Sequence, residues 1–246
     1  NYMLTYRSTN GDTKQYQELY RNDSVFVTDQ TFDRELRAFH NNLRMGADYF
    51  FSETSILTAA YTWRRTKGKR YSHIHYRDYL TNSSNLLSHS YRTQNETETE
   101  PNSEYNLSYK KAFGRKGHEL LIDLRHLDNW EKSDQYFTET VTPKGGEKVS
   151  SLQRSINDET EKQWLFQVDY VQPFGKEGKF ETGLRSSFRD MTNNYFVADV
   201  LPDGSLQNIP MFTNNFIYDE NIHGVYGIYG NRHGKFSYQA GLRAEW

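Results

Sequence analysis

The sequence predicts an all-β fold: an antiparallel up-and-down meander that forms part of a large transmembrane β-barrel. Three observations lead to this prediction: apolar and polar residues alternate, short turns join the alternating runs in pairs, and aliphatic residues are scarce. Of the 246 residues only 35% are hydrophobic, yet 15% are aromatic. Soluble domains average ~45–50% apolar residues, and disordered chains are poor in aromatics. The composition therefore disfavours both a soluble aliphatic core and a disordered chain.

The alternation is clearest over the last eleven residues, 236–246. All six residues in step with Phe236 and Trp246 are apolar or aromatic, and the five between them are Ser, Gln, Gly, Arg and Glu. A period of two is typical of a strand with one apolar face. Residues 43–51, 57–64, 119–125 and 164–170 repeat the pattern, with Phe50 and Leu165 as exceptions. These segments are predicted as strands.

Four short turns lie between alternating runs, at 52–55, 114–117, 175–178 and 231–234. Gly and Asn supply the positive φ angles that tight hairpins need. The stretches 9–34, 67–102, 131–161 and 189–215 are long and polar, and we expect them to be loops. Short turns alternating with long loops are typical of bacterial outer-membrane barrels, with the turns in the periplasm and the loops outside.

The domain prediction is a single outer-membrane barrel section over residues 1–246, with about nine strands by this hairpin count. Bacterial single-chain barrels close with an even number of strands. A sheet in lipid also cannot leave its edges unpaired. We therefore expect further strands on at least one side, and no plug domain is visible in the sequence.

Other classes of protein are disfavoured by what the sequence lacks. There is no cysteine, so disulfides and cysteine metal sites are excluded, and the net charge of −2 gives no argument for a nucleic-acid partner. No run approaches the ~18 apolar residues of a membrane helix. Nucleophile-elbow, metalloprotease, phosphate-loop and dinucleotide motifs are all absent from the sequence. We expect neither an enzyme nor a cofactor, and no metal site.

Charged residues on the polar positions of the strands are expected to face the lumen, where water or a plug solvates them. One interpretation is a polar wall that guides substrate or contacts the plug. The favoured one is a set of cross-strand ion pairs and solvated side chains that hold the register. These candidates are Asp123, Arg125, Asp169, Glu181, Arg185, Arg189, Arg243 and Glu245.

Aromatic residues gather near the predicted strand ends. Two such girdles mark the membrane interfaces of a barrel, and this interpretation is favoured over a stacking surface for carbohydrates or nucleobases. The candidates near the turns are Tyr49, Phe51, Phe113, Tyr170, Phe174, Phe180 and Phe236, and Trp63 lies nearer the loops.

Two clusters in the polar stretches suggest ligand binding. His73 and His75 would share one strand face and could hold a metal with Asp78 nearby, although a hydrated pair is favoured. Alternating glutamates at positions 96, 98 and 100 could attract Ca²⁺ or a cationic ligand. The favoured interpretation is that Glu96, Glu98 and Glu100 keep an extracellular ribbon soluble.

Residues 216–246 contain a hairpin pattern of Tyr-x-Glu-x-Ile, a Tyr, a glycine turn and Tyr-Gln-x-Gly-Leu-Arg-x-Glu. The pattern resembles a recurrent hairpin of TonB-dependent receptors, and more specifically of the outer-membrane β-barrel family abundant in Bacteroidota. Residues 167–183 and 109–118 resemble the two preceding hairpins. Gly224 departs from the pattern, because the family more often has Ala there. The matching positions are Tyr218, Glu220, Ile222, Tyr226, Gly234, Tyr238, Gln239, Gly241, Leu242, Arg243 and Glu245.

The resemblance implies a TonB-energised importer that moves a metal chelate, peptide or glycan into the periplasm. Its implied partners are outer-membrane lipid and TonB, which would be contacted through a segment not in this chain; a surface lipoprotein is a further candidate. Two alternatives stay open. One is a non-transporting barrel subunit or scaffold, and the other is a soluble all-β binding protein packed as a sandwich.

Overall fold

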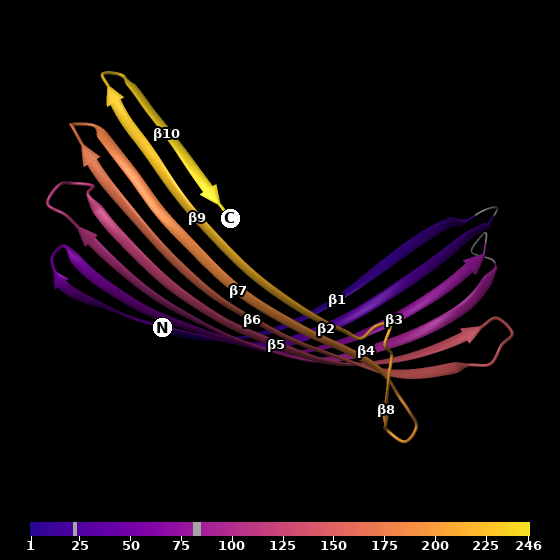
Figure 1. The fold of residues 1–246 in the computed structure, drawn as a ribbon. Coiled ribbons are helices and arrows are strands. Elements are labelled where there is room, and N and C mark those ends of the chain that lie inside the picture. The colour runs from indigo at the N-terminus through magenta and orange to yellow at the C-terminus, as the bar shows by residue number, and fades with distance from the viewer. Residues whose placement is uncertain (22–23, 81–84) are drawn as a thin grey trace.

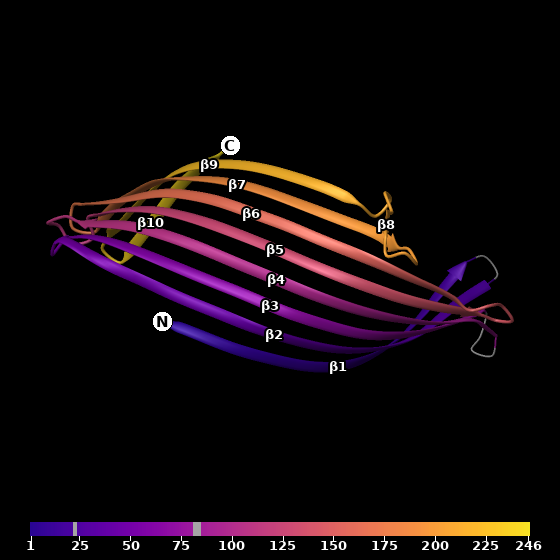
Figure 2. The ribbon, with the colours of Figure 1, turned by 90° about the horizontal axis from the view of Figure 1, so that it is seen from below.

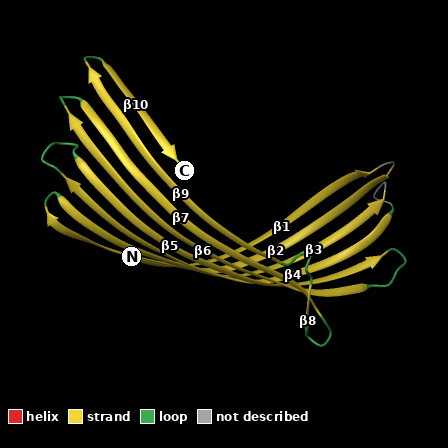
Figure 3. Ribbon diagram, in the orientation of Figure 1, coloured by secondary structure: helices red, strands yellow, loops and turns green. Residues whose placement is uncertain are grey.

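The computed structural model describes residues 1–21, 24–80 and 85–246. The regular elements in these ranges are all strands (Figure 3), and none of the described residues forms a helix long and apolar enough to cross a membrane. The strands are β1 Tyr2–Arg21, β2 Ser24–Ser52, β3 Ser55–Leu80, β4 Leu86–Ala112, β5 Glu119–Pro143, β6 Val149–Phe174, β7 Gly178–Val200, β8 Leu206–Asn208, β9 Asn214–His233 and β10 Phe236–Glu245.

All ten strands belong to one antiparallel sheet, in the order β1-β2-β3-β4-β5-β6-β7-β9-β10, with the three-residue β8 paired to β7. Each long strand therefore lies beside its sequence neighbours, and the predicted all-β antiparallel meander is confirmed. The sheet forms a single layer, twisted and curved into a saddle (Figures 1 and 2). It is open, because β1 and β10 are its two edges and do not pair with each other.

The short turns that connect β2 to β3, β4 to β5, β6 to β7 and β9 to β10 gather at one end of the sheet (Figure 1). We call this end the turn end. Gly117, Gly175 and Gly234 have φ angles of 79°, 56° and 61° there. Side chains with a Cβ are disfavoured at such angles, so glycine sets these turns. The Arg115 guanidinium also donates to the carbonyls of Pro173 and Gly175, which ties two neighbouring turns together.

The prediction of long polar loops is wrong for most of the residues concerned, because β1 to β7 continue through them. Residues 22–23 and 81–84 lie outside the described ranges. Antiparallel pairing satisfies the backbone without an apolar face, and oppositely charged cross-strand pairs add to it. An example is Arg154, which donates from Nε and Nη2 to the two carboxylate oxygens of Asp134 at 2.9 and 2.7 Å. We call these strand extensions the distal arms: 9–21, 24–34, 67–80, 86–102, 131–143 and 149–161.

The cross-strand register sorts the side chains onto two faces of the sheet. The apolar face carries Tyr61 and the residues in register with it, and the polar face carries their immediate chain neighbours. Most of the buried side chains lie on the polar face, including Ser72, Ser155 and Glu96, which are 1%, 2% and 4% exposed. The polar face is therefore the more enclosed side.

Candidate functional site

An aromatic row crosses the apolar face in strict register from β3 to β7. Successive ring centroids from Tyr61 through Tyr105 and His126 to Trp164 are 4.8, 6.0 and 4.1 Å apart, and Phe188 follows beside Trp164. Between this row and the turn end the face is almost wholly apolar. We call this band the apolar belt: Met45, Ala47, Tyr49, Leu57, Ala59, Tyr61, Tyr105, Leu107, Tyr109, Leu120, Ile122, Leu124, Trp164, Phe166, Val168, Phe180, Leu184, Phe188, Val225, Tyr229, Phe236, Tyr238, Ala240 and Leu242.

The belt ends abruptly toward the distal arms. On the same face, the next row beyond the aromatic row pairs Asp128 with Lys162 and Lys162 with Asp190. Charged residues therefore follow the aromatic rings after one step of two residues. An aromatic row bordered by charge is the pattern of a membrane–water interface.

The eight aromatic residues predicted as interface residues all lie on the apolar face, by register or by ring contact. Tyr49 and Phe51 are 4.8 Å apart, and Phe174 lies 5.3 Å from Tyr229. Phe113 contacts Tyr170 at 6.3 Å, between ring centroids in each case. At the free edge, Phe236 and Leu242 are 68% and 87% exposed. The register and the ring contacts place all eight on one face. Their contact with a membrane stays a prediction. The eight are Tyr49, Phe51, Trp63, Phe113, Tyr170, Phe174, Phe180 and Phe236.

The eight charged residues predicted to face the lumen all lie on the opposite, polar face. The structure does not bring them together at one point. Asp123 and Arg125 lie on β5, where Arg125 Nε donates to Asn106 Oδ1 at 2.9 Å. Asp169 accepts hydrogen bonds from Gln167 and from the Tyr226 hydroxyl, at 2.7 and 2.6 Å. Their role in a lumen stays a prediction. The eight are Asp123, Arg125, Asp169, Glu181, Arg185, Arg189, Arg243 and Glu245.

Three of these charged residues surround one hollow of about 260 Å³ on the polar face. Arg185 of β7 and the Arg243–Glu245 ion pair of β10 line it together with Glu220 of β9. The remaining lining residues are Gln163, Ser187, Ile222 and Gly224. Nearby, Arg189 Nε pairs with Glu161 Oε1 at 2.5 Å. The hollow presents both guanidinium and carboxylate groups to a polar solute.

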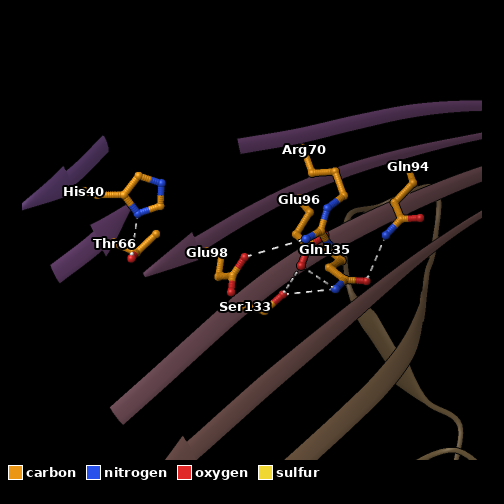
Figure 4. Close-up of polar contacts among 8 residues, drawn as sticks. All are labelled: His40, Thr66, Arg70, Gln94, Glu96, Glu98, Ser133 and Gln135. Atoms are coloured by element: carbon orange, nitrogen blue, oxygen red, sulfur yellow. Dashed lines mark hydrogen bonds and ion pairs between the residues drawn. The ribbon is translucent and has the colours of Figure 1, made fainter. Parts of the chain in front are cut away.

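A second polar group lies farther along the same face, at the base of the distal arms (Figure 4). Arg70 of β3 pairs with Glu96 of β4 at 2.5 Å, and the other Glu96 oxygen accepts from Ser133 Oγ and Gln135 Nε2 of β5, each at 2.9 Å. Glu98 lies 3.9 Å from the Arg70 guanidinium. Three strands are thus joined through one carboxylate. The favoured expectation of a solvated Glu96 is wrong, because its neighbours enclose it.

Acidic residues crowd the neighbouring positions on this face. Glu131 of β5 pairs directly with Glu159 of β6 in the register, and like charges in that position repel. Partial burial, followed by the charges of Glu98 and Glu100, raises the pKa of Glu131. Partial burial and the charge of Glu96 raise the pKa of Glu98, against the lowering effect of Arg70. This region is electronegative and lies beyond the apolar belt.

The histidine pair lies on the apolar face of the distal arms. His73 Nδ1 is 2.6 Å from the Tyr91 hydroxyl, and the ring of His75 stacks with that of His89 at 5.9 Å between centroids. Asp78, the predicted third neighbour, points to the other face and accepts from Thr28 and Ser88. The three groups therefore do not converge.

Comparison with known proteins connects this architecture to one family. The model of the outer membrane protein beta-barrel family matches residues 111–246, which is more than half of the chain. The chain belongs to this family. The match begins at the end of β4 and covers β5 to β10, so it includes three of the four turns at the turn end, much of the apolar belt and the hollow on the polar face.

Other comparisons add little to the family assignment. No curated protein matches the chain. Among solved structures, the transport unit of the autotransporter AIDA-I from Escherichia coli aligns with 98% of this chain and 88% of its own, at 11% identity and a TM-score of 0.23. At a TM-score this low, the alignment supports no conclusion about the fold or function of this chain.

Sequence reasoning missed several residues of the site in this barrel chain. Arg70, Ser133 and Gln135 fell in stretches expected as loops, so nothing placed them opposite Glu96. A usable signal was present: Glu96, Glu98 and Glu100 recur at a spacing of two, which is typical of a strand. Had this spacing been used to predict a strand through residues 86–102, that strand would have been placed beside the preceding one, as β4 lies beside β3 in the structure.

Proposed function

We propose that this chain forms part of the barrel of a TonB-dependent receptor that imports a nutrient across the outer membrane. The observation that supports the proposal best is the separation of chemistry between the two faces of the belt region. In lipid, the apolar belt would contact hydrocarbon, and the polar face would line a lumen wide enough for a solute and its water.

The polar face suits the passage of a hydrophilic solute. Its charges are mixed in sign, since Arg185 and Arg189 lie near Glu161 and Glu245. Exposed ion pairs of this kind contribute little to stability, so they can exchange partners with a solute at low cost. The distal arms would meet the solute first, and energy would come through TonB acting on a segment outside this chain. A metal chelate, a peptide or a glycan fits this description.

The first experiment tests which face meets lipid, and the absence of cysteine makes it clean. Ser186 and Ser187 are adjacent on β7 and face opposite sides of the sheet, with Ser186 opposite Phe166 and Ser187 beside the polar hollow. The single variants Ser186→Cys and Ser187→Cys each replace one oxygen by sulfur. In intact cells, a small membrane-impermeant maleimide should label Ser187→Cys, whereas Ser186→Cys should react only with a lipid-soluble maleimide. Equal labelling of both by the impermeant reagent would contradict the proposal.

The second experiment tests energised import against the scaffold alternative. A strain that lacks the gene for this protein is grown with a ferric chelate, a peptide mixture or a glycan as the limiting nutrient. We expect a growth defect on one of these sources, and the same defect in a strain without TonB, with no further loss when both deletions are combined. Normal growth on all three sources would favour the scaffold.

The soluble sandwich alternative has no support. A sandwich needs two packed sheets with strands of about 5–6 residues. The described residues form one sheet instead, and β2 alone has 29 residues.

A further inference from the structure

Three basic residues follow one another along the apolar face of β3, directly after Trp63. Arg65, Lys67 and Lys69 are all exposed and in step with the belt residues Tyr61 and Trp63. We call them the basic strip. Arg65 is the eleventh residue of β3, and a spanning strand needs about 9–11 residues to cross the hydrocarbon. The strip therefore begins where β3 would leave the membrane.

No carboxylate lies directly opposite the strip on the strands on either side, and the nearby Glu35 of β2 pairs with Arg37. In register with the three basic residues, β2 and β4 present the residues Asn41, Phe39, Arg37, Pro101, Thr99 and Thr97. Within the described ranges, none of the three strip residues has an ion-pair partner. The two neighbouring arginines that point to the polar face differ, because Arg64 and Arg70 pair with Glu104 and Glu96. The positive charge of the strip is uncompensated.

An apolar groove lies next to the strip, on the belt side. Its volume is about 870 Å³, with Ala47 and Ala59 between larger side chains of which Met45, Tyr61 and Trp164 are examples. Asp128, one row beyond the aromatic row, also lines it. The alanines on β2 and β3 are directly paired, so the two strands leave a shallow depression between taller neighbours. From Tyr61 to Arg65 the distance along the strand is about 13 Å. On this face of β3 a single residue, Trp63, separates the groove residue Tyr61 from Arg65, so the groove and the strip are neighbours.

We propose that this surface binds a phosphorylated lipid of the outer leaflet, with an acyl chain in the groove and its phosphate groups on the basic strip. The proposal rests on the lipid contact of the apolar face stated under the proposed function. Uncompensated Lys and Arg at a membrane surface attract anionic headgroups, and Arg and Lys bind phosphate oxygens through charge-assisted hydrogen bonds. The height of the strip at the end of the spanning segment matches the position of a headgroup rather than that of a soluble ligand.

The test measures lipid binding to the protein purified from outer membranes in a mild non-ionic detergent. Bis-phosphorylated lipid A is titrated, and bound lipid is counted by native mass spectrometry. The triple variant Arg65→Ser, Lys67→Ser, Lys69→Ser should lose at least tenfold in affinity. A matched control, Lys148→Ser, Lys176→Ser, Lys235→Ser, removes the same charge from exposed residues in connections between strands and should bind as the parent does.

The groove is tested separately. Ala59→Phe fills the depression, and Ala240→Phe adds the same ring to the apolar face of β10, outside the groove. We expect Ala59→Phe to weaken lipid binding several-fold and Ala240→Phe to leave it unchanged. Heat-modifiable migration on a gel confirms that every variant is folded.

Two outcomes separate this inference from the proposed function. If the Ser186 and Ser187 labelling shows the expected sidedness but the strip variant binds lipid A like its control, the lipid site is wrong and the barrel orientation stands. If the labelling fails, both are overturned. Equal binding of phosphatidylethanolamine, which carries no net charge, would also contradict a site that depends on the basic strip.

Discussion

The two halves of β4 carry different kinds of side chain although they belong to one strand. Near the turn end its apolar-face residues are Tyr105, Leu107 and Tyr109, in register with aromatic and aliphatic residues of β3 and with His126, Leu124 and Ile122 of β5. In the distal arm the same face carries threonines such as Thr97, and the opposite face carries Glu96. The backbone pairing continues through both halves, but the chemistry of the side chains changes. Backbone pairing is thus common to both halves, whereas the side chains match the different surroundings proposed for each half.

The largest expected effect comes from placing a charge in each half. Leu107→Arg puts a guanidinium into the apolar belt, which would cost about 2–4 kcal/mol if the site faces the middle of a bilayer. Asn95→Arg places the same group on the same face of β4 in the distal arm, where the residue is exposed between Tyr71 of β3 and Tyr136 of β5, and should change stability little. Urea-dependent folding into lipid vesicles measures the difference. Equal stability of the two variants would mean that the belt does not contact lipid.

The next effect should be confined to the distal arms. Arg70→Met leaves the Glu96 carboxylate enclosed without its cation. Losing one partner of a buried pair costs about 3–5 kcal/mol, and the 34% exposure of the Arg70 side chain reduces our expectation to about 2–3 kcal/mol. Hydrogen exchange should speed up in the arms of β3 to β5 and stay unchanged in the belt. The double variant Arg70→Met, Glu96→Met should recover most of the loss.

A smaller effect is expected at a glycine on the polar face of the belt region. A Cβ on Gly183 would lie 2.5 Å from the Tyr226 ring and 2.7 Å from the Val168 carbonyl oxygen. Gly183→Ala should therefore cost about 1–3 kcal/mol through overpacking. Gly68→Ala is the matched control in the distal arm, since its nearest atom would be 3.9 Å away. Equal melting temperatures of the two variants would mean that the Tyr226 ring can move aside for a Cβ at position 183, and would contradict this prediction.

The smallest effect concerns pH and the repulsion between Glu131 and Glu159. Folding raises the pKa of Glu131 above its ordinary value of 4.5, so the folded arm binds protons more readily than the unfolded chain. Stability should therefore fall as the pH rises from the ordinary pKa through the raised one, and stay lower above it. Glu131→Gln should add about 0.2–1 kcal/mol at neutral pH. Amide exchange of the β5 and β6 arms at pH 5 and 7, corrected for intrinsic rates, checks this; an unchanged pH response in the variant would count against it.

The belt half was predictable from sequence because the alternation of apolar and polar residues can be recognised within each short segment. A period of two over 236–246 or 164–170 indicates a strand without any knowledge of its neighbours, and the register then places the predicted charges and aromatics on opposite faces. Glycines 117, 175 and 234 have the positive φ angles that their turns require. Membership in the outer membrane protein beta-barrel family agrees with this part of the prediction.

The distal arms were not predictable in the same way, because their signals are not local. Polar residues on both faces leave no hydrophobic period to detect, and the arms are held by pairs such as Arg154–Asp134 whose members are 20 residues apart. Glu96 illustrates the difficulty. Its residue type is common in loops, but the structure encloses it, and only the register that places Arg70 and Gln135 opposite it explains the difference.

Each hairpin continues from the turn end into the distal arms with few interruptions in its pairing, one of them between β4 and β5 at Glu100 and Pro101, and should therefore move as a stiff unit. β4 has 27 residues, which corresponds to a length of about 89 Å. A loop can close over a cargo by rotating a few dihedral angles, but these arms cannot bend sharply without rupturing several backbone hydrogen bonds. If the chain acts as the proposed receptor, a ligand bound at the tips of the arms would tilt whole hairpins, and the tilt would move the part of the sheet proposed to line the lumen.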